Sequence, residues 1–223
     1  MIKVILTGLA FGVLPTVLPA STQLCEGSGV SVSGQTPKVL ELTCEAVNTA
    51  QTLFSQCNVP PFSTPLEIEI LEEIDPGCVG QYHCGEQRIE VLSPGPMQEV
   101  RNTNSVFGFL PINEYFQSVI VHELAHASYD NVPCPLVSCR ASHEYVAYAF
   151  QIMSLSPPSL ATFESSSKLD RYILNDDLNA MVLFLAPDSF IQKVWTHLTQ
   201  QDDPCSYIGR ITEGEVFFDR VMP

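Results

Sequence analysis

The chain has 223 residues, of which 45% are hydrophobic, so it can bury a sizeable core and is expected to form one domain. It carries 10 Lys plus Arg against 25 Asp plus Glu, a formal net charge of −15 at pH 7. This charge argues against nucleic acid or an anionic membrane as a partner, because both are themselves negative. We attribute the acidic composition of the chain to a need for solubility outside the cell. Separately, we expect the protein to be a monomer.

The first twenty residues have the shape of a secretory signal peptide. Lys3 is followed by an apolar stretch that ends at Ala20, which predicts cleavage after this residue. The stretch is short for a membrane span and contains two prolines, and no later stretch is long and apolar enough to cross a bilayer. We therefore expect residues 1–20 to be removed and residues 21–223 to form a single domain, exported to the periplasm or the extracellular space.

Eight cysteines follow that segment, at positions 25, 44, 57, 78, 84, 134, 139 and 205. An even number of cysteines in an exported chain predicts as many as four disulfides and no free thiol. Eight cysteines allow too many connectivities for most pairs to be assigned. Proximity along the chain favours two local pairs, Cys78–Cys84 and Cys134–Cys139.

The hydrophobic pattern predicts both strands and helices. In the N-terminal half we expect a strand at 29–34, a helix at 36–56, strands at 66–71 and 87–92, and a tight excursion at 78–84. In the C-terminal half we expect helices at 113–130 and 141–155, a stapled loop at 131–139 between them, amphipathic segments at 168–185 and 189–200, and short strands or coil over 205–221. The pattern alone gives the fold class as α+β.

One of these helices contains the sequence His-Glu-Leu-Ala-His at 122–126. His122 and His126 are four residues apart, so they share one face of a helix and can hold one divalent cation, most often Zn²⁺. Glu123 is rotated by about 100° from His122, which places its carboxylate beside the cation, where it can polarise a metal-activated water. The alternative is a core helix whose histidines are only hydrogen-bonded. A charged Glu among apolar neighbours favours the metal site.

The run resembles the active-site helix of the zincin metallopeptidases, whose motif matches His122, Glu123 and His126 one for one. The metzincin branch of zincins continues with a Gly and a His where this chain has Tyr129 and Val132, so that branch is excluded. The gluzincin branch takes its third metal ligand from a Glu on a following helix. The resemblance implies a small mixed sheet packed on the active-site helix, with a mostly helical C-terminal part.

Glu144, 18 residues after His126, matches the gluzincin glutamate. Thermolysin-like gluzincins often place Asn before this Glu and a ligand-supporting Asp four residues after it, where this chain has His143 and Tyr148. The chain also looks like small secreted bacterial proteins of uncharacterised function that have an HExxH motif and a downstream Glu-Tyr. The similarity of motifs covers about residues 113–155.

Two other side chains compete with Glu144 for the third ligand position. His143 adjoins it but would point about 100° away on a helix. Asp130 lies four residues after His126, on the same face, where the helix should end. Asp130 is better suited to holding an imidazole in one tautomer. We predict His122, His126 and Glu144 as the metal ligands, without excluding the other two or a site with no third ligand.

The complete site implies a zinc-dependent peptidase that acts on a peptide or protein substrate. Glu123 would be the general base, accepting a proton as water attacks the carbonyl and passing it to the leaving amine. Zincins often add a Tyr or His donor to the oxyanion, and four are available, Tyr129, Tyr145, Tyr148 and His197. The alternative function is a non-catalytic exported metal-binding or structural protein that uses the same site without turnover.

Overall fold

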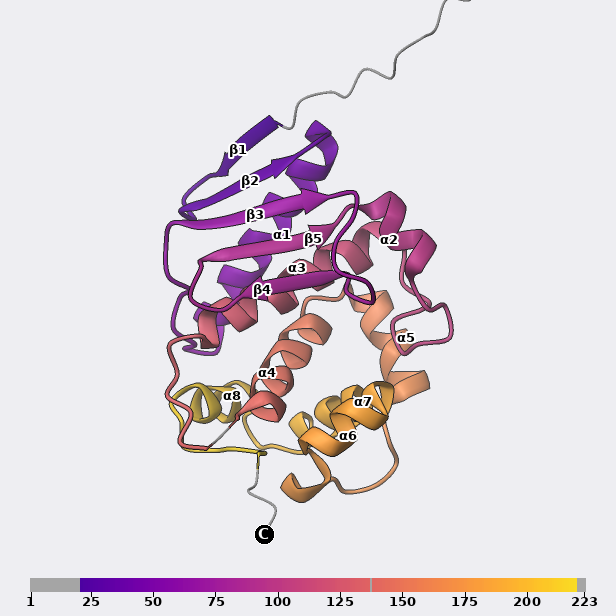
Figure 1. The fold of residues 1–223 in the computed structure, drawn as a ribbon. Coiled ribbons are helices and arrows are strands. Elements are labelled where there is room, and N and C mark those ends of the chain that lie inside the picture. The colour runs from indigo at the N-terminus through magenta and orange to yellow at the C-terminus, as the bar shows by residue number, and fades with distance from the viewer. Residues whose placement is uncertain (1–20, 137, 220–223) are drawn as a thin grey trace, which may run out of the picture.

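The computed structural model describes residues 21–136 and 138–219. Within these residues the fold is α+β, as predicted, with a five-stranded mixed sheet and eight α-helices (Figure 1). All five strands precede the helix that contains the HExxH motif, and the described chain after that helix is helical or irregular. The predicted signal peptide lies outside the described residues.

The sheet has the strand order β1-β2-β3-β5-β4. Its strands are β1 (Ser21–Cys25), β2 (Val30–Gly34), β3 (Leu66–Leu71), β4 (Gly80–His83) and β5 (Arg88–Leu92). The central strands β2, β3 and β5 run parallel, whereas the edge strands β1 and β4 are antiparallel to their neighbours. Leu66, Ile68 and Ile70 alternate along β3 and are buried, so one face of the sheet packs on helices.

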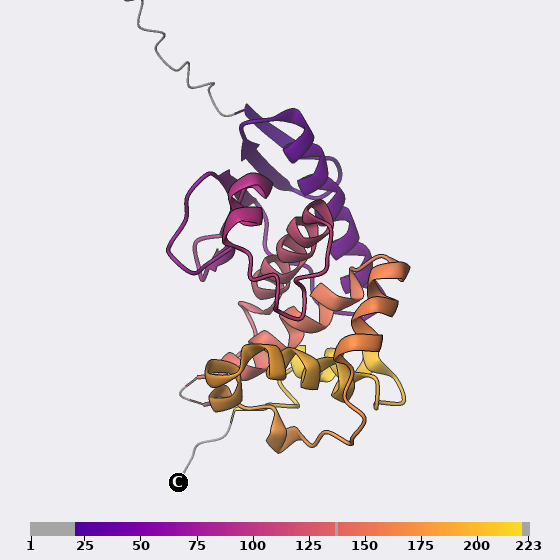
Figure 2. The same cartoon turned by 90° about the vertical axis from the view of Figure 1, so that its right-hand side faces the viewer.

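Helices pack on that buried face of the sheet and on one another. They are α1 (Pro37–Gln56), α2 (Pro94–Val100), α3 (Ile112–Tyr129), α4 (Arg140–Met153), α5 (Pro157–Ser167), α6 (Ala180–Leu185), α7 (Pro187–Leu198) and α8 (Pro204–Thr212), with a 3-10 turn at Asn175–Asp177. α3 lies between the sheet, α1 and α4, and residues 119–125 are all buried. The helices after α4 form the lower half of the molecule (Figures 1 and 2). The HExxH helix is therefore the central element of the fold.

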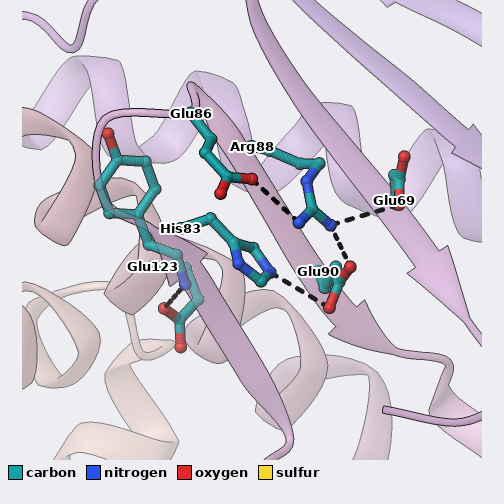
Figure 3. Close-up of polar contacts among 7 residues, drawn as sticks. Glu69, His83, Glu86, Arg88, Glu90 and Glu123 are labelled. Carbon is teal, nitrogen blue, oxygen red and sulfur yellow. Dashed lines mark hydrogen bonds and ion pairs between the residues drawn. The ribbon is translucent and has the colours of Figure 1, made fainter. Parts of the chain in front are cut away.

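The opposite face of the sheet carries a network of charged side chains, drawn in Figure 3. Arg88 on β5 forms ion pairs with Glu69 at 3.8 Å, with Glu86 at 3.1 Å and with Glu90. His83 on β4 lies 3.2 Å from Glu90. These charged groups account for the polar half of the alternating strand pattern, because this face is not covered by helices (Figure 1).

The predicted Cys78–Cys84 disulfide is wrong, and both thiols are free in the structure. The segment between them is not a tight excursion but the extended strand β4, paired antiparallel with β5. An extended chain rises about 3.3 Å per residue, which separates the two cysteines by something on the order of 15–20 Å. A disulfide requires Cα atoms within about 7 Å.

The other six cysteines form three disulfides, Cys25–Cys44, Cys57–Cys205 and Cys134–Cys139. The first ties β1 to α1, and the second joins the end of α1 to α8 across 148 residues. The third staples the loop between α3 and α4, as predicted. Disulfides of this number indicate an oxidising setting outside the cytoplasm. Among the described residues, no helix has the length and apolar character needed to cross a membrane.

Two predictions for the C-terminal part are wrong. Residues 168–185 do not form one amphipathic helix, because only the short α6 and a 3-10 turn are present. Leu174 and Phe184 belong to the apolar pattern of this segment, yet their side chains remain 58% and 63% exposed. The pattern therefore does not correspond to one buried helix face. The described part of 205–221 contains α8 where strands or coil were predicted, and only residues 213–219 are irregular as predicted; Asp203 accepts a hydrogen bond from the Ser206 amide, which makes it the N-cap of α8. The strand β1 and the helix α2 were not predicted.

Candidate metal centre

α3 presents His122 and His126 one turn apart on the side that faces α4. Their Nε2 atoms lie 3.1 Å apart and their ring centroids 4.8 Å apart. Both rings sit in a largely apolar interior, since the helix is enclosed by the sheet, α1 and α4. The two Nε2 atoms therefore approach a common point, as the four-residue spacing predicts.

Glu144 reaches the same point from the second turn of α4. Its Oε2 lies 3.5 Å from Nε2 of His122, and its Oε1 lies 3.7 Å from Nε2 of His126. The ligand atoms of the three residues all lie within 4.8 Å of one another, and together they could hold a metal ion. The Cys134–Cys139 disulfide restrains the loop that brings α4 back against α3.

The spacing of these three donors fits a tetrahedral ion. Ligand atoms at about 2.0–2.1 Å from a tetrahedral zinc are separated from one another by roughly 3.3 Å. The observed separations are 3.1, 3.5 and 3.7 Å. Two imidazole nitrogens and one carboxylate are a donor set of catalytic zinc sites, which keep a fourth position open. The residues present therefore fit the predicted zinc ion, and the same donors suit other divalent transition metals.

The charges of the ligands favour a cation. Burial lowers the pKa of His126 to about 3. Burial alone would also lower the pKa of His122, but the carboxylates of Glu144 and Glu123 outweigh it and raise the pKa. Burial alone would raise the pKa of Glu144, but the two histidines beside it lower it to about 2. At pH 7 Glu144 is thus a carboxylate and His126 is neutral, the forms that bind a metal.

Gln151 determines which nitrogen of His122 faces the ligand cluster. The Ser118 hydroxyl donates to the Tyr115 carbonyl at 2.8 Å and so accepts a hydrogen bond from Gln151 Nε2 at 3.3 Å. This leaves Gln151 Oε1 facing His122 Nδ1 at 3.0 Å, so Nδ1 carries a proton and donates it. Gln151 was not among the predicted site residues. Its signal was a polar residue seven positions after Glu144, on the same face of a helix.

Glu123, the residue after His122, has its carboxylate against β4 (Figure 3). Its Oε2 accepts a hydrogen bond from the backbone N–H of Tyr82 at 2.9 Å, and the residue is only 7% exposed. Burial raises the pKa of Glu123 to about 7; His122 opposes this rise and Glu144 adds to it. A carboxyl group with a pKa near neutrality can both accept and return a proton at physiological pH.

The two competing candidates for the third ligand lie elsewhere. Asp130 accepts hydrogen bonds from the Tyr82 hydroxyl at 3.0 Å and from the Gly85 amide at 3.2 Å. The expectation that Asp130 holds an imidazole is therefore wrong, because its carboxylate ties β4 to the end of α3. The ring of His143 packs on Tyr129, with centroids 4.1 Å apart. Neither residue belongs to the group that could hold a metal ion.

Of the four candidate oxyanion donors, Tyr148 lies at the site. Its ring packs edge-on against His122, with centroids 4.6 Å apart, and its hydroxyl has no hydrogen-bond partner among the described residues. The Tyr129 hydroxyl donates to a backbone carbonyl of α8 at 3.4 Å. The Tyr145 hydroxyl lies 2.9 Å from Nδ1 of His197, and both side chains are buried. These three are engaged in the core.

Comparisons of the chain with curated proteins and with solved structures found no match. A family model matches residues 30–221, which include the ligand cluster and every described element except β1. The match covers far more than half of the chain. The chain therefore belongs to DUF6639, a family of unknown function.

Proposed function

We propose that this protein is an exported, zinc-dependent peptidase with a zincin-like, gluzincin-type site. The observation that carries the proposal is the convergence of His122, His126 and Glu144 on one point, with the buried carboxyl group of Glu123 near enough to interact electrostatically with His122 and Glu144. The packing of a mixed sheet on the HExxH helix and the mostly helical C-terminal part support it. The proposed substrate is a peptide or protein, and the proposed working form is a monomer.

Each residue of the site has a chemical task. A zinc ion held by the three ligands supplies a Lewis acid for the peptide carbonyl and lowers the pKa of the attacking water. Glu123 accepts the proton that this water loses and donates it to the leaving amine. Gln151 keeps the proton of His122 on Nδ1, which reserves Nε2 for the ion.

Tyr148 is the proposed donor to the oxyanion. Burial raises the pKa of Tyr148 far above its usual value, so the hydroxyl keeps its proton at every physiological pH. A hydroxyl that stays protonated and has no other partner among the described residues can donate to the negative charge that develops on the carbonyl oxygen. Tyr148→Phe is therefore expected to lower kcat and to leave zinc binding unchanged.

The test begins with metal analysis of the purified mature protein. We expect about one zinc per chain, and we expect His122→Ala to lose it, because two ligands do not form a closed site. A broad panel of peptides is then screened with and without a chelator. Glu123→Gln keeps the size of the side chain but cannot accept the proton, so hydrolysis should fall by roughly 10²–10⁴-fold with zinc retained.

The results separate three cases. Stoichiometric zinc in His122→Ala would overturn the site itself. Zinc binding without cleavage of any peptide in the panel would favour the non-catalytic metal-binding protein. Cleavage by Glu123→Gln at the wild-type rate would leave the enzyme but remove Glu123 as its base.

A further inference from the structure

The edge strand β4 approaches α3 most closely at Gly80, directly over Glu123. A Cβ atom built at Gly80 would lie 2.8 Å from Glu123 Oε1, 2.8 Å from Val119 Cγ1 and 2.9 Å from Glu123 Cγ. Real Cβ atoms essentially never approach other atoms closer than 3.0 Å. Gly80 is not among the glycines with positive φ, so its backbone does not require a glycine. What requires the glycine is the space that Glu123 and Val119 occupy.

Tyr82, two residues after Gly80, connects the same strand to α3 through two hydrogen bonds. Its backbone N–H donates to Glu123 Oε2 at 2.9 Å, and its hydroxyl donates to Asp130 at 3.0 Å. Glu123 and Asp130 are seven residues apart, about two turns of α3. The Tyr82 amide points away from β5, because a strand alternates the side on which its N–H groups lie. An amide that would otherwise be exposed at the sheet edge is thus used to hold the buried carboxyl group.

We infer that β4 is the positioning element of the general base: the Tyr82 amide holds one carboxylate oxygen of Glu123, and the missing side chain of Gly80 leaves room for the other. This inference rests on the proposed role of Glu123. A side chain at position 80 would have to push the carboxylate aside or lift β4 from α3. Either displacement would move the base relative to His122 and the ligand cluster.

A purely structural role for Gly80 is the competing explanation, because Val119 lies as close to the added Cβ as Glu123 does. The two explanations differ in what relieves the clash. If Glu123 is the group displaced, shortening its side chain will make room for Ala at position 80. If β4 simply packs too tightly on α3, the substitution will be equally harmful whatever stands at position 123.

A double-mutant cycle on zinc-free protein tests this without any substrate. Gly80→Ala is measured by chemical denaturation in three backgrounds: wild type, Glu123→Gln and Glu123→Ala. The glutamine has the shape of the glutamate, so the clash persists, whereas alanine removes Cγ and the terminal atoms. We expect Gly80→Ala to lower the folding equilibrium constant on the order of tenfold to a hundredfold in the first two backgrounds, and less in the third, where only the contact with Val119 remains.

Gly95→Ala is the matched control. Gly95 lies in α2, has no positive φ, and a Cβ added there would meet no atom within 4 Å. The same substitution at this site should leave the denaturation midpoint unchanged or raise it, since alanine favours a helix. A destabilisation by Gly80→Ala that is equal in all three backgrounds, or no larger than that of Gly95→Ala, overturns the inference. If Gly80→Ala does not fold in the wild-type background, folding of the Gly80→Ala, Glu123→Ala double variant supports the inference. If the double variant does not fold either, the inference is overturned.

A second measurement uses the zinc-loaded protein. Gly80→Ala should bind zinc with the wild-type affinity, because none of the ligands touches position 80. If the wild type cleaves peptides, kcat should fall roughly tenfold to a hundredfold with little change in KM, as expected for a displaced catalytic group. Unchanged kcat, or lost zinc, overturns the positioning role. If the wild type cleaves no peptide, the proposed function is wrong, but the result of the double-mutant cycle still shows whether Glu123 and Gly80 are coupled.

Discussion

Oε1 of Gln151 lies 3.0 Å from Nδ1 of His122, on the opposite side of the imidazole from the nitrogen that faces Glu144. Gln151 follows Glu144 by seven residues on α4, whereas thermolysin-like proteins place their supporting Asp four residues after the Glu. In this chain that nearer position is Tyr148, whose ring packs on His122. The group that orients the imidazole here thus lies about one turn further along the helix than in thermolysin-like proteins, and it is a neutral amide.

Gln151→Met should weaken zinc binding by about 10–100-fold, because methionine fills a similar volume but cannot accept the Nδ1 proton. His122 would then be free to rotate or to adopt the other tautomer. A competition titration with a chromogenic chelator measures the change. Gln56→Met, at the exposed end of α1, is the control and should bind zinc like the wild type. Equal affinities for the two variants would show that Gln151 does not orient the ligand.

Asp219→Ala should destabilise the protein by about 1–2 kcal/mol, since it removes the cap of α4. The Asp219 carboxylate accepts hydrogen bonds from the amides of Ala141 and Ser142 at 2.8 and 3.0 Å and from the Ser142 hydroxyl at 2.8 Å. The side chain of Cys139, the N-cap residue of α4, makes no capping hydrogen bond. Because Glu144 follows on the next turn, a frayed start of α4 should also weaken zinc binding. Denaturation and the chelator titration measure the two effects.

The control for this cap is Asp203→Ala, which removes the N-cap of α8, where Asp203 accepts a hydrogen bond from Ser206. The loss of stability should be smaller than for Asp219→Ala, because Asp203 is exposed and accepts one hydrogen bond where the buried Asp219 accepts three. Zinc affinity should be unaffected, because α8 contributes no ligand. A fall in zinc affinity of the same size in both variants would mean that general destabilisation, rather than the position of Glu144, is responsible.

His197 should make the zinc-free protein lose stability as the pH falls from about 6.5 to about 4. Burial lowers the pKa of His197 to about 4 in the folded state. Its Nδ1 lies 2.9 Å from the Tyr145 hydroxyl and its Nε2 3.0 Å from Oδ1 of Asn175. The unfolded chain binds a proton below about pH 6.5, so acid favours unfolding in this window, by up to roughly 3 kcal/mol. Above about pH 6.5 this contribution is fully present.

His197→Gln removes the titrating group, so the variant should show a shallower loss of stability between about pH 6.5 and 4. The measurement is the free energy of unfolding from denaturant titrations at several pH values, with a chelator present throughout. The variant will be less stable at pH 7 because it disrupts a buried contact, and only the slope against pH is compared. Identical slopes would show that His197 does not carry a lowered pKa in the folded protein.

Two thiols per chain should react in the denatured, non-reduced protein, and these should be Cys78 and Cys84. In the native protein Cys84 is accessible to solvent. The pKa of its thiol is nevertheless raised, by the partial loss of solvation around it and by the nearby carboxylate of Asp130. Its alkylation should therefore be slow at neutral pH and accelerate as the pH rises, because the thiolate is the reactive form. Mass spectrometry after alkylation counts and locates the labels, and Cys84→Ser should leave one. No label in the wild type would mean that the two are bonded and that β4 is not extended.

Local periodicity accounts for what could be predicted. The helix ranges of α1, α3 and α4 and the strands β3 and β5 follow from apolar residues spaced at 3.6 or 2 residues. The pairing of His122 with His126 follows from helix geometry alone, since residues four apart are neighbours on a helix in any fold. The prediction of Glu144 as a ligand depended on the resemblance to gluzincins. The prediction of the stapled loop depended on two cysteines five residues apart.

Tertiary structure decided the rest, because it determines which distant residues meet. The Tyr82 amide and Glu123 are 41 residues apart, and the Ala141 amide and Asp219 are 78 apart. Spacing along the chain carries no information about such pairs, since their contact depends on how β4, α3, α4 and the C-terminal segment pack. The same holds for β4 itself: the five residues between Cys78 and Cys84 look like a loop in the sequence, and only the hydrogen bonds from β5 make four of them an edge strand.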